Sequence, residues 1–241
     1  MKRGSYTYDF PRPTVTVDVV VFGVDMTTPL ELKVLLIKRG RAGTAFEGYW
    51  ALPGGFVDKD EDLEVAARRE LREEAKAEPA YIEQLATFGK PGRDPRGHVI
   101  SVAFMALVRI DQTEIEAGDD AEPGSETWMP VDNLTKIDLA FDHDEILSTA
   151  LKRLRSKMRW HPIGIDLMPE TFSIDDLRRL YETLLGRELN RRNFRRKVLS
   201  HDVLSCAESR RIGGPGRPAE LWRFDRAAYE ALLDEGGDFE V

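Results

Sequence analysis

Three glutamates stand at helical spacing in one charged segment, which reads GGFVDKDEDLEVAARRELREEAKA from Gly54 to Ala77. Glu70, Glu73 and Glu74 occupy positions i, i+3 and i+4, so a helix that begins near Leu63 places all three carboxylates on one face. Like charges at this spacing destabilise a helix by roughly a few tenths of a kcal/mol per pair unless a cation lies among them. Because Mg²⁺ prefers carboxylate and phosphate oxygens, the cluster predicts a magnesium site that could clamp a pyrophosphate and activate a water.

A plainer interpretation is a solvated helix face whose acids are balanced by Arg68, Arg69 and Arg72. The glutamates alone do not decide between the two interpretations. The wider spacing favours the metal site, because the chain reads Gly-x5-Glu-x7-Arg-Glu-Leu-x-Glu-Glu from Gly55 to Glu74. This pattern resembles the Nudix box.

The resemblance implies an α/β fold, the Nudix α/β/α sandwich with a mixed sheet, in which this segment forms a loop, a helix and a second loop. Members of the family typically cleave a nucleoside diphosphate linked to another group. The implied metal ligands are the carbonyl of Gly55 with Glu70, Glu73 and Glu74, and the implied catalytic residues are Glu61, Arg69 and Glu73, of which Glu61 and Arg69 brace the loop.

The end of the segment departs from the Nudix pattern, which continues with any residue, a glycine and an aliphatic residue. This chain has Ala75, Lys76 and Ala77 there. A glycine just after a helix typically adopts a left-handed backbone, which costs another residue roughly 1 to 2 kcal/mol. Lys76 could also bring an ammonium group towards the carboxylates. Whether the site hydrolyses its ligand or only binds it therefore stays open.

The rest of the first half alternates between strand and helix patterns. Strands are expected from their β-branched and apolar runs, and a second helix from its spacing and polar start. The acidic stretch EAGDDAEPGSE, residues 116–126, is expected to be a loop. The expected strands are 14–24, 32–38, 81–89, 98–110 and 127–130, and the expected second helix is 142–157.

Two further stretches resemble segments of Nudix proteins that handle ADP-ribose. They are GRDPRGHVISVAF, from Gly92 to Phe104, and LAFDHDEIL, from Leu139 to Leu147. For every single residue the alternative is ordinary surface charge or core packing. The candidate ligand residues are Arg39, Arg93 and Arg96, which could neutralise phosphates, and Trp50 and Phe141, which could stack on adenine.

Charge divides the chain unequally. The net charge of the 241 residues is −8, but residues 1–150 carry −11 and residues 151–226 carry +8. We expect two domains, a Nudix-like ligand-sensing domain at 1–160 and a DNA-binding domain at 161–241. The single cysteine, the lack of a secretory signal and the lack of a long apolar run favour a cytoplasmic protein without a membrane partner.

The basic second domain begins with a capped helix. Ser173 is followed by Asp176 at the position of a capping-box partner, and Gly186 ends the helix. A second helix, capped by Asn190, carries five cations opposite an apolar face. Two strands, 204–211 and 220–225, flank the glycine-rich stretch IGGPGRPA, and the final residues DEGGDFEV look frayed.

Helix, turn, basic helix and basic hairpin predict a winged helix-turn-helix domain that binds double-stranded DNA. The alternative is a small dimerisation or protein-binding module with a solvated basic face. The candidate DNA-binding residues are Arg191, Arg192, Asn193, Arg195, Arg196 and Lys197 on the helix and Arg210, Arg211 and Arg217 on the hairpin.

The two halves together resemble NrtR, a family of bacterial Nudix-related transcriptional regulators of NAD metabolism. The resemblance rests on the domain pairing, on FDHDEIL from Phe141 and on GRELNRRNFRRKVL from Gly186. It implies a homodimeric repressor that binds a palindromic operator until ADP-ribose or a related nucleotide releases it. An Mg²⁺-dependent ADP-ribose pyrophosphatase, possibly in the same protein, is the alternative, and sugar regulators of the same architecture remain open.

Overall fold

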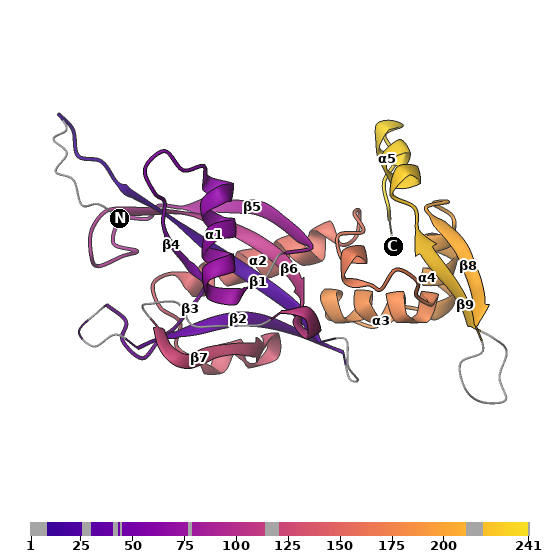
Figure 1. Cartoon of the computed structure of the whole chain (residues 1–241), viewed down its shortest axis with the longest axis horizontal. Coiled ribbons are helices and arrows are strands. Elements are labelled where there is room, and N and C mark those ends of the chain that lie inside the picture. Colours follow the sequence, from indigo (N-terminus) through magenta and orange to yellow (C-terminus); the bar gives the residue numbers. More distant parts are fainter. Residues whose placement is uncertain are drawn as a thin grey trace. The chain divides into compact units, whose positions relative to one another are not determined.

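A computed structural model describes most of the chain, which divides into two compact units, Met1–Leu151 and Lys152–Val241. Each unit is described by itself. Figure 1 shows the elements in order along the chain. The described residues are 9–25, 30–40, 43, 45–76, 79–113, 121–210 and 219–240.

A seven-stranded sheet forms the centre of the first unit, with the strand order β3-β2-β1-β6-β5, while β4 pairs with β1 and β7 with β2. β1 and β6 run parallel and every other pair is antiparallel, so the sheet is mixed, as predicted. The strands are β1 (Thr14–Asp25), β2 (Glu31–Arg39), β3 (Trp50–Ala51), β4 (Gly54–Phe56), β5 (Tyr81–Phe88), β6 (Val99–Arg109) and β7 (Ala121–Pro130).

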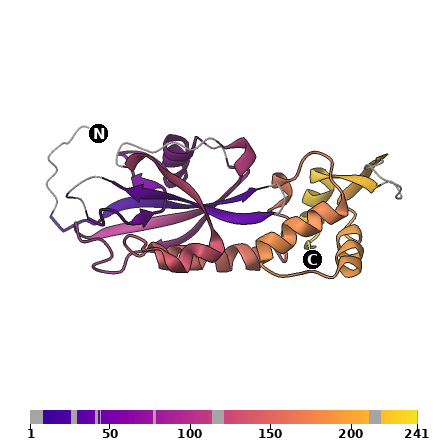
Figure 2. The same ribbon diagram turned by 90° about the horizontal axis from the view of Figure 1, so that it is seen from below.

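β1 lies in the interior of the sheet, and the residues on both of its faces are apolar and buried. Val17, Val19 and Val21 pack with α1 (Leu63–Ala75), and the alternate residues Val20 and Phe22 are equally buried. Figure 2 shows α1 and α2 (His143–Lys157) on opposite sides of the sheet. This arrangement is the predicted α/β/α sandwich. Short 3-10 turns lie at η1 (Ile110–Gln112) and η2 (Val131–Lys136).

Two local expectations for this unit were wrong or incomplete. Residues 121–126 do not form a loop, because β7 begins at Ala121 and its pairing with β2 extends to Arg39 despite the proline and glycine that it contains. β3 and β4 were not expected. They are two and three residues long, too short for an alternating pattern, and their partners in the sheet define them.

The second unit holds the expected helix-turn-helix and hairpin (Figure 1). Ser173 and Asp176 form the predicted capping box, and Gly186 ends the first helix with a φ of 66°. Asn190 caps the second helix through the backbone N–H of Asn193. The elements are η3 (Ile165–Leu167), α3 (Ile174–Leu185), α4 (Arg191–Leu199), β8 (Leu204–Arg210), β9 (Ala219–Phe224) and α5 (Arg226–Asp234).

The end of the chain differs from expectation. α5 was not predicted, and Phe239, in the stretch expected to be frayed, is fully buried and donates its backbone N–H to the carbonyl of Trp160 at 3.0 Å. The neighbouring Glu240 adds an ion pair with Lys197 at 2.9 Å, so several contacts hold this polar, glycine-containing tail. Of the helices in the described ranges, none has the length and apolar composition that crossing a bilayer requires.

Candidate functional site

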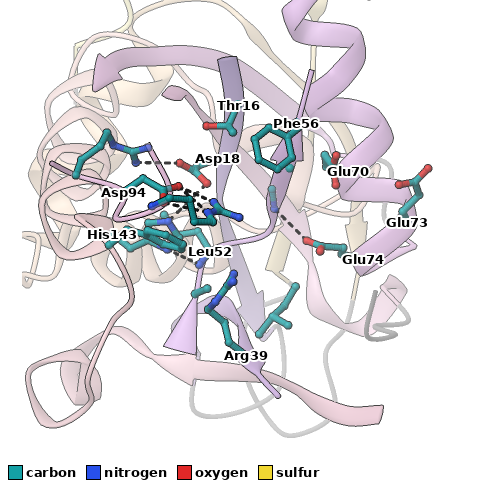
Figure 3. Close-up of a pocket in the computed structure, with 17 residues that line it drawn as sticks. Thr16, Asp18, Arg39, Leu52, Phe56, Glu70, Glu73, Glu74, Asp94 and His143 are labelled. Carbon is teal, nitrogen blue, oxygen red and sulfur yellow. Dashed lines mark hydrogen bonds and ion pairs between the residues drawn. The ribbon is translucent and has the colours of Figure 1, made fainter. Parts of the chain in front are cut away.

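A cavity of about 530 Å³ lies in the first unit, at β1, β4 and the acidic face of α1 (Figure 3). It brings together the three glutamates, Gly55 and four of the five candidate ligand residues. The lining residues are Thr16, Asp18, Ile37, Arg39, Ala51, Leu52, Gly54, Gly55, Phe56, Glu70, Glu73, Glu74, Arg93, Asp94, Arg96, Phe141 and His143.

Glu70 and Gly55 are packed directly against each other. A Cβ added to Gly55 would lie 2.3 Å from Oε1 of Glu70, so only glycine leaves room for this carboxylate. Burial raises the pKa of Glu70, against the opposing effect of Arg69, which donates from Nη1 to Oε1 at 2.7 Å. Glu70 therefore lies beside the backbone of Gly55, and its role as a metal ligand stays a prediction.

Glu74 is a carboxylate of the cavity with a strongly raised pKa. Its Oε2 accepts a hydrogen bond from the backbone N–H of Gly54 at 3.0 Å. Burial, together with the charges of Glu70, Asp18 and Glu73, raises the pKa of Glu74 to about 8. A hard divalent cation would stabilise the ionised form of carboxylates that lie this close together. The chemistry of the residues present therefore fits Mg²⁺.

The bracing role implied for Glu61 and Arg69 has a matching geometry. Arg69 donates from Nε to Oε1 of Glu61 at 2.8 Å and from Nη2 to Oε2 at 2.9 Å, and also from Nη2 to the carbonyl of Phe56 at 3.1 Å. This bidentate pair lowers the pKa of Glu61 to about 2. The catalytic roles of these residues stay predictions.

Glu73 is turned towards Arg69, whose Nη1 lies 3.4 Å from Oε2. Within the described ranges, no three His, Cys, Asp or Glu side chains converge closely enough to hold a metal ion as they stand. Lys76 has the left-handed backbone expected of it, with a φ of 42°, but its side chain is exposed and does not line the cavity.

Arg93 lines the cavity, and its guanidinium forms ion pairs with two carboxylates of the protein. Its Nε and Nη2 lie 2.8 and 2.5 Å from the two oxygens of Asp142, and Nη2 lies 3.4 Å from Asp18. The side chain is 4% exposed. The buried Asp18 and the half-buried Asp142 already balance its charge, and a phosphate-binding role for Arg93 stays a prediction.

Sequence reasoning missed the acids and the histidine of this buried network. His143 accepts the backbone N–H of Leu52 at Nδ1, at 2.9 Å, so the proton is on Nε2, which lies 3.6 Å from Asp18. Burial would raise the pKa of Asp18, but His143, Ser101 and Arg93 together lower it. One signal was visible, because an aspartate inside an apolar strand such as β1 needs buried partners.

An aromatic and cationic cluster forms another part of the lining. The ring of Phe141 lies 4.7 Å from that of Phe46, and both residues have positive φ values, 55° and 60°. The guanidinium carbons of Arg39 and Arg96 lie 5.1 and 5.3 Å from the centre of the Phe141 ring. Bulky residues hold a left-handed backbone only where the surroundings enforce it, and such strain concentrates at binding sites.

Arg96 lies between two aromatic rings. Its guanidinium carbon is 5.3 Å from the ring of Phe56 as well as from that of Phe141, and Asp94 holds it at 2.6 Å. Trp50 is not among the residues that line the cavity, and its stacking on adenine stays a prediction. In β3 successive side chains point to opposite faces, and the neighbouring Ala51 is the one that lines the cavity.

In the second unit, α4 exposes four of its five cations, and Lys197 is half-buried. Phe194 and Val198 form the buried face, as predicted. Arg210 is the last residue of β8, and its side chain, like the whole of Arg211 and Arg217, lies outside the described residues.

Comparison with known proteins agrees with this architecture. The NUDIX domain family matches residues 12–150, and the NrtR DNA-binding winged helix domain matches residues 164–224. The ADPR responsive transcriptional repressor NtrR of Acinetobacter baylyi is 37% identical over 92% of this chain and 86% of its own length. An ADP-ribose pyrophosphatase of Methanocaldococcus jannaschii is 38% identical over 62% of this chain and 75% of its own length.

Solved structures give the same result. Shewanella oneidensis NrtR complexed with a 27mer DNA is 32% identical, with a TM-score of 0.72 over 90% of this chain and 95% of that one. The NUDIX domain of the same protein complexed with ADP ribose is 38% identical, with a TM-score of 0.52 over 61% of this chain and 94% of that one. The chain therefore belongs to the NrtR family of transcriptional regulators, in which a NUDIX domain precedes a DNA-binding winged helix.

Proposed function

We propose that this chain is a transcriptional repressor of NAD-metabolism genes that binds its operator through α4 and the β8–β9 hairpin and is released by ADP-ribose in the first-unit cavity. One observation carries the proposal: a single chain joins a Nudix cavity to a winged helix whose second helix bears five cations. The relatives of the same architecture that bind DNA and respond to ADP-ribose support it.

The cavity offers the two kinds of group that ADP-ribose needs. Phe141 presents a ring for the adenine, and Arg39 and Arg96 beside that ring offer guanidinium groups to the diphosphate, although Arg96 shares its charge with the buried Asp94. The acidic face of α1 suits a cation that accompanies the phosphates. For the ligand to act as an inducer, it must bind the form with low DNA affinity more tightly than the form with high affinity.

The experiment is a gel shift of the full chain on the DNA upstream of its own gene, with and without ADP-ribose. Micromolar ADP-ribose is expected to weaken the complex for the wild-type chain, and Phe141→Ala is expected to bind the same DNA without this response. Asp111→Asn, which alters a charge of η1 outside the cavity, is the matched control and should respond like the wild type. Unchanged DNA binding at saturating ADP-ribose would refute the proposal.

A second activity, hydrolysis of ADP-ribose, is favoured by the retained glutamates. Mg²⁺ held by Glu70, Glu73, Glu74 and the carbonyl of Gly55 would supply Lewis-acid polarisation of the diphosphate. We expect Mg²⁺-dependent AMP release that Glu73→Gln abolishes. Glu64→Gln, which removes a carboxylate of α1 that pairs with Arg68 outside the cavity, should keep it. A wild-type chain without turnover at high concentration would restrict the site to binding.

A further inference from the structure

The polar residues of α4 fall into two groups when they are placed around the helix axis. Successive residues are rotated by about 100°, so Arg196 points away from the buried Phe194 and Val198, with Arg192 and Asn193 close to either side of it. The remaining cations, Arg191, Arg195 and Lys197, lie nearer the buried face. The helix therefore has an outward stripe and two flanks.

Carboxylates of three different elements hold the flanking cations. Arg191 pairs with Asp175 of α3, Arg195 with Glu220 of β9 at 2.6 Å, and Lys197 with Glu240 of the C-terminal segment at 2.9 Å. The guanidinium of Arg195 also lies 6.0 Å from the ring of Trp222 on β9. These contacts connect α4 to α3, to the hairpin and to the C-terminal segment.

The outward stripe is different. In the part of the chain that the structure describes, no carboxylate lies within ion-pair distance of Arg192 or Arg196. Arg196 donates from Nη2 to Oδ1 of Asn193 at 2.6 Å, which leaves the amide NH₂ of Asn193 as its outward group. A shallow hollow is lined by Asn190, Arg192, Asn193, Arg195, Arg196 and Leu199.

We infer that Arg192, Asn193 and Arg196 are the residues that discriminate between base pairs, and that they select guanine. The inference rests on the proposed DNA binding. The stripe offers mainly donors, since both arginines lack acceptors and the Asn193 oxygen already accepts one hydrogen bond from Arg196. In the major groove guanine presents two adjacent acceptors, N7 and O6, whereas adenine pairs an acceptor with a donor. The flanking cations, tied to the scaffold, contact phosphates and set the register without reading sequence.

The test is selection of duplexes from a random pool by the full-length chain, followed by affinity measurements on an enriched and a scrambled duplex. The wild type is expected to enrich guanine at fixed positions. Arg192→Ala and Arg196→Ala should each weaken the enriched duplex by about 10- to 100-fold, leave the scrambled duplex within a few-fold, and relax the guanine preference at one position.

Arg195→Ala is the matched control from the same helix. It should weaken both duplexes by a similar factor and keep the selected sequence, with the slope of log affinity against log salt reduced by about 0.9. An unchanged far-ultraviolet circular dichroism spectrum shows that each variant is folded. If Arg196→Ala does not fold, Arg196→Gln replaces it.

The outcomes separate the two proposals. If the wild type enriches no sequence at all, the proposed regulatory function fails, and the inference fails with it. If the wild type enriches a sequence without guanine at fixed positions, or if Arg192→Ala and Arg196→Ala weaken both duplexes equally and keep the preference, DNA binding stands and the assignment of the outward stripe is overturned.

Discussion

Single residues hold the Nudix-type loop in place through close packing rather than through charge alone. Because Gly55 has no side chain, the carboxylate of Glu70 packs directly against its backbone, and Glu61 holds the guanidinium of Arg69 in a bidentate pair. The roles of both pairs were implied by the sequence pattern. The contact between Gly55 and Glu70 was not, because a sequence does not show which side chain fills the space beside a glycine.

Gly55→Ala is expected to destabilise the first unit by about 1–3 kcal/mol, because the new methyl group and the Glu70 carboxylate cannot occupy the same space. Urea unfolding measures the change. Gly89→Ala is the control, since its Cβ would lie 3.5 Å from Ile100, an ordinary contact. Equal stability of the Gly55 variant and the wild type would show that the loop and Glu70 are not packed as described.

Lys76 is strained where the family pattern has glycine. With a φ of 42°, it ends α1 in the left-handed region. Lys76→Gly is expected to raise the free energy of unfolding by about 0.5–1 kcal/mol, since the strain of roughly 1–2 kcal/mol is offset in part by the entropy of an unfolded glycine. Gly186→Ala, at a φ of 66° after α3, should show the opposite sign in the same unfolding measurement. A destabilised Lys76→Gly would contradict this account.

At the scale of elements, the network around Arg93 joins the loop between β5 and β6, which holds Arg93, to three other parts of the first unit. It connects β1 through Asp18, β6 through Ser101 and the start of α2 through Asp142 and His143. The segment LAFDHDEIL was recognised in the sequence by resemblance, but its acids were not assigned partners. Pairs that are 49 or 75 residues apart become visible only when the sheet is assembled.

Arg93→Leu is expected to cost about 3–5 kcal/mol, because the buried Asp18 and the half-buried Asp142 lose their common cation. Denaturant unfolding of the full chain measures the loss. Arg109→Leu is the control, because the Asp111 carboxylate that pairs with Arg109 is 40% exposed. We expect the Arg109 variant to lose less than about 1 kcal/mol. Similar losses in the two variants would show that the network around Arg93 contributes no more than a surface pair.

At the scale of the whole molecule, the fold class, the two-domain order and both capped helices of the second unit could be predicted, because each depends on local periodicity or capping. The tail at Phe239 and the short strands β3 and β4 could not, since tertiary contacts define them. α5 was missed although its signal is local, because Asp225 caps its first turn through the backbone N–H of Ala228. The face on which the Trp50 side chain lies could not be predicted either, because the pairing register decides which face of a strand meets a cavity.

The central claim is that the nucleotide cavity of one unit and the DNA-binding surface of the other are energetically linked. Linkage is reciprocal: a factor by which ADP-ribose weakens DNA binding must equal the factor by which DNA weakens ADP-ribose binding. We expect a coupling of about 5- to 150-fold, the range typical of allosteric proteins.

The most direct test is calorimetric titration of ADP-ribose into the full chain, alone and saturated with a duplex that it binds specifically. The account predicts that the dissociation constant for ADP-ribose rises in the presence of DNA by the factor found for DNA in the presence of ADP-ribose. Phe141→Ala should reduce ADP-ribose affinity in both titrations. Equal dissociation constants for ADP-ribose with and without DNA would contradict the account.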